Sequence, residues 1–114
     1  MKTVTLGVSD LESAKGDLAR AFAGEAPGER IDFGSIELLW RVLTPRRWAL
    51  LRAMAGQGPL SIRATARRLD RDVKGVHADI HALLAAGLLE RTPDGQVVFP
   101  YDAVHVDFTV AAAG

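Results

Sequence analysis

The amino-acid sequence predicts a mainly helical α+β fold built around one hydrophobic core. A chain of 114 residues with 48% hydrophobic content is long enough for about one domain. Most apolar residues recur at helical spacing between breaks that contain Gly or Pro. Two other runs, Thr3 to Val8 and Val104 to Val110, alternate apolar and polar residues as half-buried strands do. We therefore expect a helical body flanked in the sequence by one strand on each side.

The composition excludes several functional classes. The sequence has no cysteine, so disulfides, thiolate zinc sites and a cysteine nucleophile are excluded. No apolar run approaches the roughly 20 residues that span a bilayer. Residues 1–10, MKTVTLGVSD, also lack the apolar block and the small-residue cleavage site of a signal peptide. We therefore expect a cytoplasmic protein.

Residues 1–34 are expected to form an extension that contains one strand and one helix. The strand places three apolar side chains on one face: Val4, Leu6 and Val8. Ser9, followed three residues later by Glu12, matches the capping box and predicts a helix from Ser9 to Phe22. The sequence GEAPG at residues 24–28 then predicts a loop, because it combines Pro with Gly.

Residues 35–100 are expected to form the main domain, which begins with two helices. Ser35 can cap the first helix, whose inward-facing residues are Ile36, Leu39, Trp40 and Leu43. The Thr44-Pro45 pair ends this helix and starts the next, because proline disfavours helical geometry in the residue before it and suits a first helical position. The second helix carries an apolar stripe that includes Trp48. Both tryptophans are therefore expected in the core.

Two further helices are predicted on either side of the short turn Asp70-Arg71. Ser61 can cap a helix that runs through Leu69, and Asp72 can cap a longer helix that stops at Gly87. The residues expected to point inward from the longer helix are Val73, Val76, Ile80, Leu83 and Leu84.

The segment after Gly87 predicts a β-hairpin. Residues 88–91 and 96–99 lie on either side of Asp94-Gly95, a dipeptide that favours the tight turn of a hairpin. Two helices joined by a short turn and followed by a hairpin make a helix-turn-helix with a wing. We expect this winged helix-turn-helix to be the DNA-binding part of the chain.

The charge distribution supports an anionic partner, although the net charge is zero. Residues 41–74 contain nine Lys and Arg against two Asp, which gives net +7. Residues 1–40 contain four basic against seven acidic residues, and residues 75–114 contain one against five. A solvated helical face is the simpler explanation for a group of arginines, but such a face normally mixes the two signs. The basic middle of the chain favours nucleic acid.

With its apolar residues inward, the longer helix would present four residues outward: Lys74, His77, Ala78 and His81. Arg71 lies just before it. The first turns of a recognition helix enter the major groove, where Arg and Lys donate to guanine and to phosphates. The residues predicted to contact DNA are therefore Arg46, Arg47, Arg63, Arg67, Arg68, Arg71, Lys74, His77 and His81.

The segments LTPRRWALLRAM and GPLSIRATARRLDRDVKGVHADIHALLAAGLLER, with the hairpin after them, resemble MarR/ArsR-type winged-helix regulators over residues 35–100. The segments TPRR, RRLDRDVKGVHADI and PYDAVHVDFTV are similar to a small group of prokaryotic regulators, some encoded beside RelE-like or HigB-like toxins and described as antitoxins. The resemblance implies a homodimeric transcriptional regulator, an autorepressor that binds its own operator. It adds Arg91, near the wing tip, to the predicted DNA contacts.

Neither a metal site nor an active site is expected. His77 and His81 have the spacing of two ligands on one helical face, but HADIH lacks the Glu that follows the first His of a zincin motif. The third histidine, His105, is distant in sequence. No Gly-rich phosphate loop is present, and the serines at 9, 35 and 61 are explained by helix capping. We expect no enzyme activity and no cofactor.

Residues 101–114 are expected to form a C-terminal strand and tail. Unless this strand pairs with the strand at Thr3 to Val8, or both pair across a twofold axis, the two strands leave exposed edges. We therefore expect a homodimer held by Val4, Leu6, Val8, Val104, Val106, Phe108 and Val110. The alternative function is a protein-interaction module that neutralises a basic partner such as a RelE/HigB-like toxin through the acidic residues 1–40, without reading DNA sequence.

Overall fold

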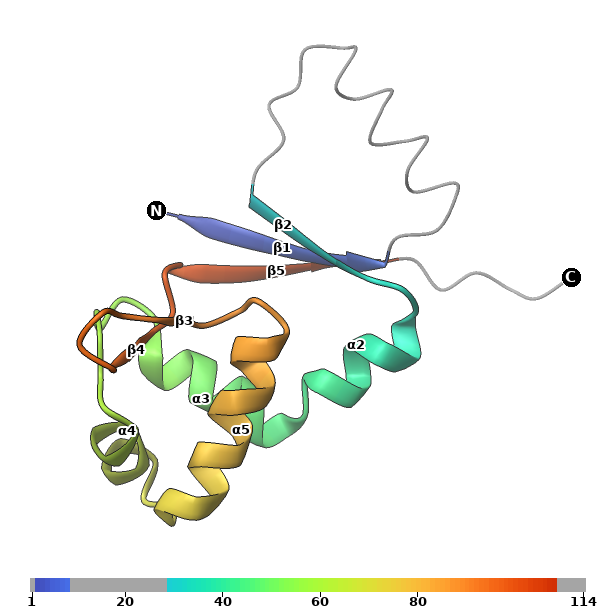
Figure 1. Cartoon of the computed structure of the whole chain (residues 1–114). Coiled ribbons are helices and arrows are strands. Elements are labelled where there is room, and N and C mark those ends of the chain that lie inside the picture. The colour runs from blue at the N-terminus through green and yellow to red at the C-terminus, as the bar shows by residue number, and fades with distance from the viewer. Residues whose placement is uncertain (1, 9–28, 109–114) are drawn as a thin grey trace, which may run out of the picture.

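The computed structural model describes residues 2–8 and 29–108 (Figure 1). The described elements, in chain order, are β1 (Thr3–Val8), β2 (Glu29–Phe33), α2 (Ile36–Val42), α3 (Pro45–Met54), α4 (Ile62–Leu69), α5 (Val73–Ala85), β3 (Glu90–Arg91), β4 (Val97–Val98) and β5 (Ala103–Asp107). The expected α+β fold is confirmed. The helix predicted from Ser9 to Phe22 and the residue Val110 lie outside the described residues.

A three-stranded sheet joins the two strands that were predicted from alternating residues. Its strand order is β2-β1-β5, and β1 pairs in parallel with both neighbours. Thr3 lies opposite Ala103, and Gly7 lies opposite Asp107. The backbone of Lys2 continues this pairing, because its N–H donates to Asp102 Oδ2 at 2.8 Å and its carbonyl accepts from Asp102 N at 2.7 Å. The two predicted strands therefore pair with each other within one chain.

Strand β2 was not predicted from the sequence, and the expectation of only one strand before residue 35 is wrong. Its sequence ERIDF contains two apolar residues, Ile31 and Phe33, between three charged ones. β2 is an edge strand, and it becomes part of the sheet by pairing with β1 alone.

The side chain of Arg30 connects the three strands of the sheet. Arg30 of β2 donates from Nε to Asp32 Oδ1 at 2.8 Å, and its Nη1 lies 3.8 Å from Asp107 Oδ2 on β5. The arginine side chain reaches β5 by passing over Gly7 of the central strand. A Cβ at Gly7 would lie 2.2 Å from Arg30 Nη2, so the absence of a side chain there makes room for the guanidinium.

All four described helices begin at the residues expected to cap them. The cap oxygens of Ser35 and Thr44 accept from backbone N–H groups three residues later at 3.2 and 3.3 Å. Those of Ser61 and Asp72 do the same at 3.0 and 2.9 Å. Each cap satisfies a donor that a helix leaves without an internal partner, which explains why these short helices start where they do. Gly87 ends α5 with a φ of 82°, as expected.

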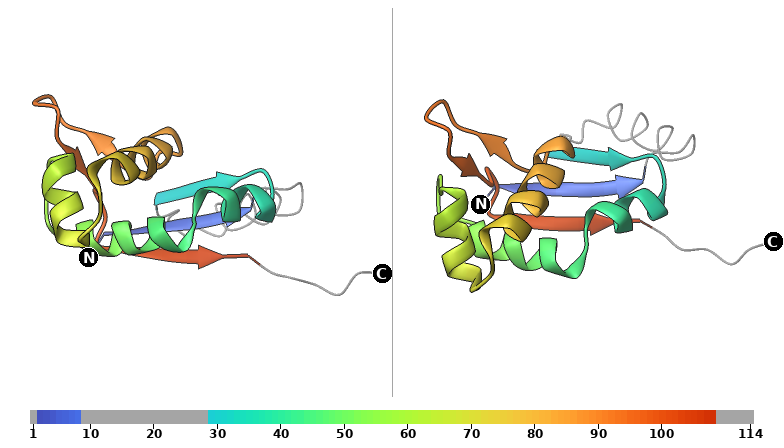
Figure 2. Two further views of the ribbon diagram at one scale, coloured as in Figure 1. Left: turned by 90° about the horizontal axis from the view of Figure 1, so that it is seen from below. Right: turned by 60° about the horizontal axis from the view of Figure 1, so that its bottom comes forward.

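The hydrophobic core lies between the helices and one face of the sheet. The helices lie below the sheet in Figure 1, and the left view of Figure 2 shows the molecule from that side. Strand β1 contributes Val4 and Leu6, which are fully buried. The helices contribute Leu39, Leu43, Leu50, Leu51, Met54, Ala66, Val76, Ile80 and Leu83, and residues after α5 complete the core. The apolar faces of the sheet and of the helical body thus form one core.

Two residues expected in the core are instead exposed. Trp40 is 51% exposed, because Leu39 and Leu43 occupy the buried face of the short helix α2 and the next residue along points away from it. Its ring packs edge to face on Phe108, with centroids 5.7 Å apart. Val73 is 44% exposed at the first position of α5. Trp48, the other tryptophan expected in the core, packs against it but is only half-buried.

The predicted hairpin is present, although its strands are shorter than expected. Strands β3 and β4 pair in antiparallel fashion, with Arg91 opposite Val97. Gly95 in the turn has a φ of 86°, which a residue without a side chain adopts readily. Leu60, just before α4, makes two backbone hydrogen bonds with Val97 at 2.8 and 2.9 Å. The hairpin is therefore tied to the segment that leads into α4.

Candidate nucleic-acid interface

The α4–α5 unit presents the most basic part of the described surface. Asp70 ends α4 in a left-handed conformation with φ 50° and ψ 50°, which an aspartate tolerates better than most residues. Arg71 N then donates to Ala66 O at 3.0 Å, and Asp72 caps α5. This compact turn holds the C-terminal end of α4 beside the first turn of α5, so basic residues from both helices come together.

Most of the residues predicted to contact DNA are exposed. On α4 the exposed cations are Arg63, Arg67 and Arg68. On α5 the exposed residues include Lys74, His77, Ala78 and His81, as the helical spacing predicted. Arg46 at the start of α3 and Arg91 on the hairpin are also exposed. Arg68 donates to Gln57 Oε1 at 2.8 Å.

Two predicted contact residues, Arg47 and Arg71, occupy a different environment. Arg47 Nε lies 3.1 Å from Asp79 Oδ1, and Arg71 Nη2 lies 2.8 Å from Asp79 Oδ2. The exposed fractions of the three side chains are 21%, 19% and 13%. The expectation that Arg71 points outward just before α5 is therefore wrong, because its guanidinium turns inward to pair with Asp79 of that helix. We name these three residues the Asp79 junction.

The Asp79 junction fixes α5 to the rest of the domain. Besides its ion pair, Arg47 donates from Nη1 to the backbone carbonyls of Val42 at 2.9 Å and Arg41 at 3.3 Å, at the C-terminal end of α2. One side chain thus connects α2, α3 and α5. Sequence reasoning missed this role, because Asp79 lies 32 residues from Arg47 and nothing local connects the two.

A hollow of about 360 Å³ lies where α4 meets the start of α5. Its lining residues are Arg63, Ala66, Arg67, Arg71 and Val73. Three of these five residues carry guanidinium groups, and we name the hollow the arginine groove. Arg71 contributes from its inner side, and its Nη1 is buried without a hydrogen-bond acceptor. A concave surface with several guanidinium donors suits phosphate or carboxylate oxygens.

Carboxylates do little to neutralise this surface. Asp70 and Asp72 are exposed close to the turn, and Asp72 is engaged in capping α5. Asp79 is enclosed by its two arginines. The cations of Arg63, Arg67 and Lys74 therefore face solvent, and no ion pair to them is found within residues 2–8 and 29–108. The excess of basic residues in this part of the sequence is therefore also an excess of basic side chains on the α4–α5 surface.

The residues predicted to hold a dimer have mixed positions. Val4 and Leu6 have no exposed surface, because they face the helices of their own chain. The expectation that they lie at a dimer interface is therefore wrong for these two. The half-buried residues of the set are Val8, Val104, Val106 and Phe108.

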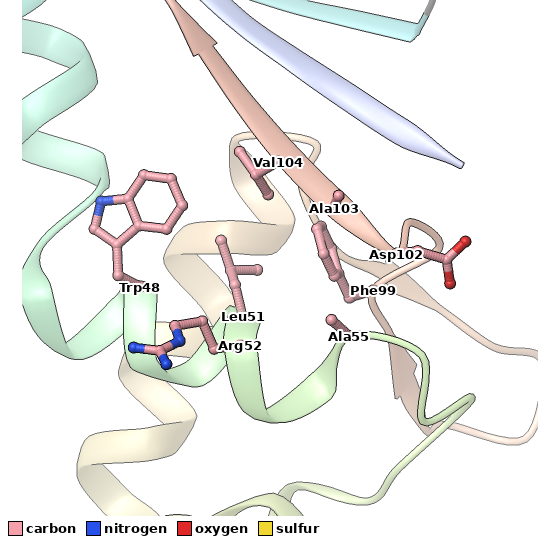
Figure 3. Close-up of a pocket in the computed structure, with 8 residues that line it drawn as sticks. All are labelled: Trp48, Leu51, Arg52, Ala55, Phe99, Asp102, Ala103 and Val104. Atoms are coloured by element: carbon pink, nitrogen blue, oxygen red, sulfur yellow. The ribbon is translucent and has the colours of Figure 1, made fainter. Parts of the chain in front are cut away.

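A second hollow, of about 200 Å³, lies between α3 and β5 (Figure 3). It is lined by Trp48, Leu51, Arg52, Ala55, Phe99, Asp102, Ala103 and Val104. Apolar side chains form most of this lining, with Arg52 and Asp102 as its charged members. No local pattern in the sequence predicts this hollow, because its walls come from segments about fifty residues apart.

At the sheet end of the molecule, Tyr101 is buried and its hydroxyl donates to Glu29 Oε2 at 3.5 Å. Burial raises the pKa of Tyr101 above its ordinary value, and the negative charges of Glu29 and Glu90 raise this pKa further. In the described segments, no group of three or more His, Asp or Glu side chains could hold a metal ion. No helix among these segments is long and apolar enough to cross a membrane.

These features define an α+β domain with a basic helical surface at one end and a parallel sheet at the other. A family model named HVO_A0114 matches residues 42–106, more than half of the 114 residues, so the chain belongs to the HVO_A0114 family. The matched region runs from the end of α2 to β5 and includes the whole α4–α5 surface. Searches of curated proteins and of solved structures returned no match.

Proposed function

We propose that this protein binds double-stranded DNA and regulates transcription, with α4 and α5 as a helix-turn-helix and the β3–β4 hairpin as its wing. The observation that carries the proposal is the arginine groove at the junction of α4 and α5, together with the exposed cations around it. In a helix-turn-helix the second helix enters the major groove, and the turn lies against the phosphate backbone. The cations are concentrated where that geometry needs them.

The order of the elements supports the same conclusion. Helix α3 packs beside α4 and α5, and the hairpin follows α5 directly. The backbone hydrogen bonds between Leu60 and Val97 tie the hairpin to the start of α4. A winged helix has the same sequence of three helices and a hairpin, with a short strand before its second helix.

Contacts to phosphates and contacts to bases are assigned to different residues. Arg63 and Arg67 line the groove on α4 and serve as phosphate contacts, which position a protein on DNA without reading its sequence. Lys74 and His77 lie on the exposed side of the first turns of α5, where a side chain can reach base edges. Base reading is thus proposed for Lys74 and His77, in place of Arg71.

The regulator is further proposed to act as a homodimer, since a twofold arrangement of helix-turn-helix units matches the symmetry of palindromic operators. With Val4 and Leu6 buried, an interface would use surfaces outside the core side of the sheet. Light scattering of the purified protein is expected to give twice the chain mass of 12.2 kDa. A mass of one chain at working concentrations would contradict the dimer.

The test is binding of the full-length protein to fluorescent duplexes, measured by anisotropy at several salt concentrations. One duplex carries the region upstream of the protein's own gene, and the other has a random sequence. Lys74→Ala is expected to weaken binding to the preferred duplex by about 1–3 kcal/mol and binding to the random duplex much less. Arg67→Ala is expected to weaken both about equally.

Arg52→Ala is the matched control, because it removes an exposed arginine of α3 that lies outside the arginine groove. It is expected to leave DNA binding close to wild type. Equal losses for Arg52→Ala and Arg67→Ala would contradict a localised interface. If the wild-type protein binds neither duplex at low salt, the DNA proposal fails, and the alternative of a protein-interaction module takes its place.

A further inference from the structure

A pair of histidines lies on the exposed side of α5, one turn apart. His77 Nε2 and His81 Nε2 are 3.1 Å from each other, and the ring centroids are 4.1 Å apart with an angle of 37° between the planes. Both side chains are exposed. The spacing of four residues places them on one helical face, but spacing alone does not make the two nitrogens converge. In this structure they do converge.

The separation of the two nitrogens fits two ligands of one metal ion. Transition-metal ions bind imidazole nitrogen at about 2.0–2.1 Å, so two such ligands lie about 2.9 Å apart at a right angle and about 3.3 Å apart at the tetrahedral angle. The observed 3.1 Å falls between these values. The two nitrogens therefore already lie at the separation that two ligands of one ion require.

The surroundings define what kind of site this is. Asp79, the carboxylate between the two histidines in sequence, is held by Arg47 and Arg71 and is not available as a third ligand. Lys74, one turn before His77, is a cation and disfavours metal binding. An ion held by two neutral imidazoles keeps water in its other positions, and imidazole ligands suit copper, nickel and zinc rather than magnesium or calcium.

We propose that His77 and His81 form a two-ligand site for a divalent transition-metal ion of the copper, nickel and zinc group. Affinity is expected to be highest for Cu²⁺, in keeping with the general order of stability for divalent ions on nitrogen ligands. The site lies on the surface proposed to face DNA, but its existence does not depend on DNA binding.

The experiment uses untagged full-length protein without DNA. Titration calorimetry with Cu²⁺, Ni²⁺ and Zn²⁺ is expected to show one ion per chain, whereas Mg²⁺ is expected to show none. His77→Ala and His81→Ala are each expected to lower Cu²⁺ affinity by roughly tenfold or more, because either change leaves a single ligand. Electron paramagnetic resonance of the Cu²⁺ complex is expected to show two coordinated ring nitrogens in the wild type and one in each variant.

His105→Ala is the control, since His105 is the third histidine of the chain and is exposed on β5. It is expected to bind Cu²⁺ as the wild type does. The proposal fails if wild-type protein takes up no ion, if the single variants of α5 bind as tightly as the wild type, or if His105→Ala loses as much affinity as they do. Because all three histidines are exposed, circular dichroism is expected to show an unchanged fold in every variant.

Discussion

The Asp79 junction and the arginine groove use the same residue types for different purposes. In the junction, Arg47 and Arg71 are largely buried and share one carboxylate between α3 and α5. In the groove, Arg63 and Arg67 face solvent on α4. Arg71 contributes to both regions, with one nitrogen on Asp79 and its side chain in the wall of the groove. The comparison shows that one acidic residue divides the basic segment into a structural part and an exposed part.

This division changes how the charge of the segment is counted. The sequence assigns nine cations to residues 41–74, but two of them, Arg47 and Arg71, pair with Asp79, whose single negative charge lies outside that block and offsets one of their two positive charges. Charge that is paired inside a domain contributes to its stability, whereas charge that faces solvent attracts a polyanion. The two regions should therefore respond to mutation in different measurements.

The largest loss of stability is expected when the carboxylate shared by Arg47 and Arg71 is removed. Asp79→Ala leaves two largely buried guanidinium groups without their partner, and we expect it to lower the free energy of unfolding by about 3 kcal/mol. Urea unfolding followed by circular dichroism measures the loss. Lys74→Ala, on the exposed side of the same helix, is expected to change stability by about 0.5 kcal/mol or less. A small effect of Asp79→Ala would mean that the junction does not hold α5.

A second test separates the two kinds of arginine by their response to salt. Arg63→Ala is expected to reduce the slope of log affinity for DNA against log salt by about 0.9, because one phosphate contact is lost. Arg47→Ala is expected to leave that slope unchanged but to lower stability by about 1.5–3 kcal/mol, through loss of charged hydrogen bonds. Similar slopes for both variants would contradict the assignment of a phosphate contact to Arg63 and of a structural role to Arg47.

A smaller loss of stability is expected when the ion pairs of Arg30, a third paired arginine, are disturbed. Gly7→Ala places a Cβ where Arg30 Nη2 now lies, so the flexible end of that side chain must move off Asp32 and Asp107. Exposed ion pairs contribute little, and alanine restricts the unfolded chain more than glycine does. We expect destabilisation of less than about 1 kcal/mol. A much larger loss in urea unfolding would show that backbone, rather than the arginine tip, yields.

The smallest expected effect concerns the acidic end of the molecule, where the sign of the local charge is reversed. Tyr101 is the single tyrosine of the chain, so the ultraviolet absorbance of tyrosinate reports its ionisation alone. Its pKa is raised by burial and by Glu29 and Glu90, so it should stay protonated above pH 10 in the folded state. Because the folded state holds this proton more tightly, the associated stability is present below pH 10 and is lost as pH rises further.

Glu29→Gln is the matched variant for that titration. It removes one negative charge beside the phenol and replaces a carboxylate acceptor with a neutral amide oxygen, so we expect the pKa of Tyr101 to fall toward its ordinary value while burial and Glu90 keep it somewhat raised. An unchanged pKa in this variant would mean that Glu29 contributes nothing and that burial and Glu90 cause the shift.

The parts of the fold that could be predicted from sequence are those with local causes. Ser35, Thr44, Ser61 and Asp72 cap helices through hydrogen bonds to residues three positions later, so the sequence contains all the information needed. The hairpin turn at Gly95 is local in the same sense. Strand β2 could not be predicted, because its five residues become a strand only beside β1, which lies about 25 residues earlier.

Only part of the candidate surface could likewise be predicted from the sequence. The exposure of Lys74, His77 and His81 follows from the spacing of buried residues along α5. The inward orientation of Arg71 does not follow from this spacing. Spacing along the chain does not show whether a long side chain points to solvent or pairs with a carboxylate eight residues later. The convergence of the histidine nitrogens likewise depends on side-chain rotamers, which spacing leaves open.

The parallel pairing of β1 with β5 also determines when the fold can be completed. Thr3 and Ala103 are partners, so every helix and the hairpin must be synthesised before β1 acquires its second neighbour. Closing such a long loop costs entropy before any contact compensates for it, and chains with distant pairings fold slowly. Until β5 arrives, one edge of β1 lies open beside apolar side chains. We therefore expect a nascent chain to be most prone to aggregation just before β5 leaves the ribosome.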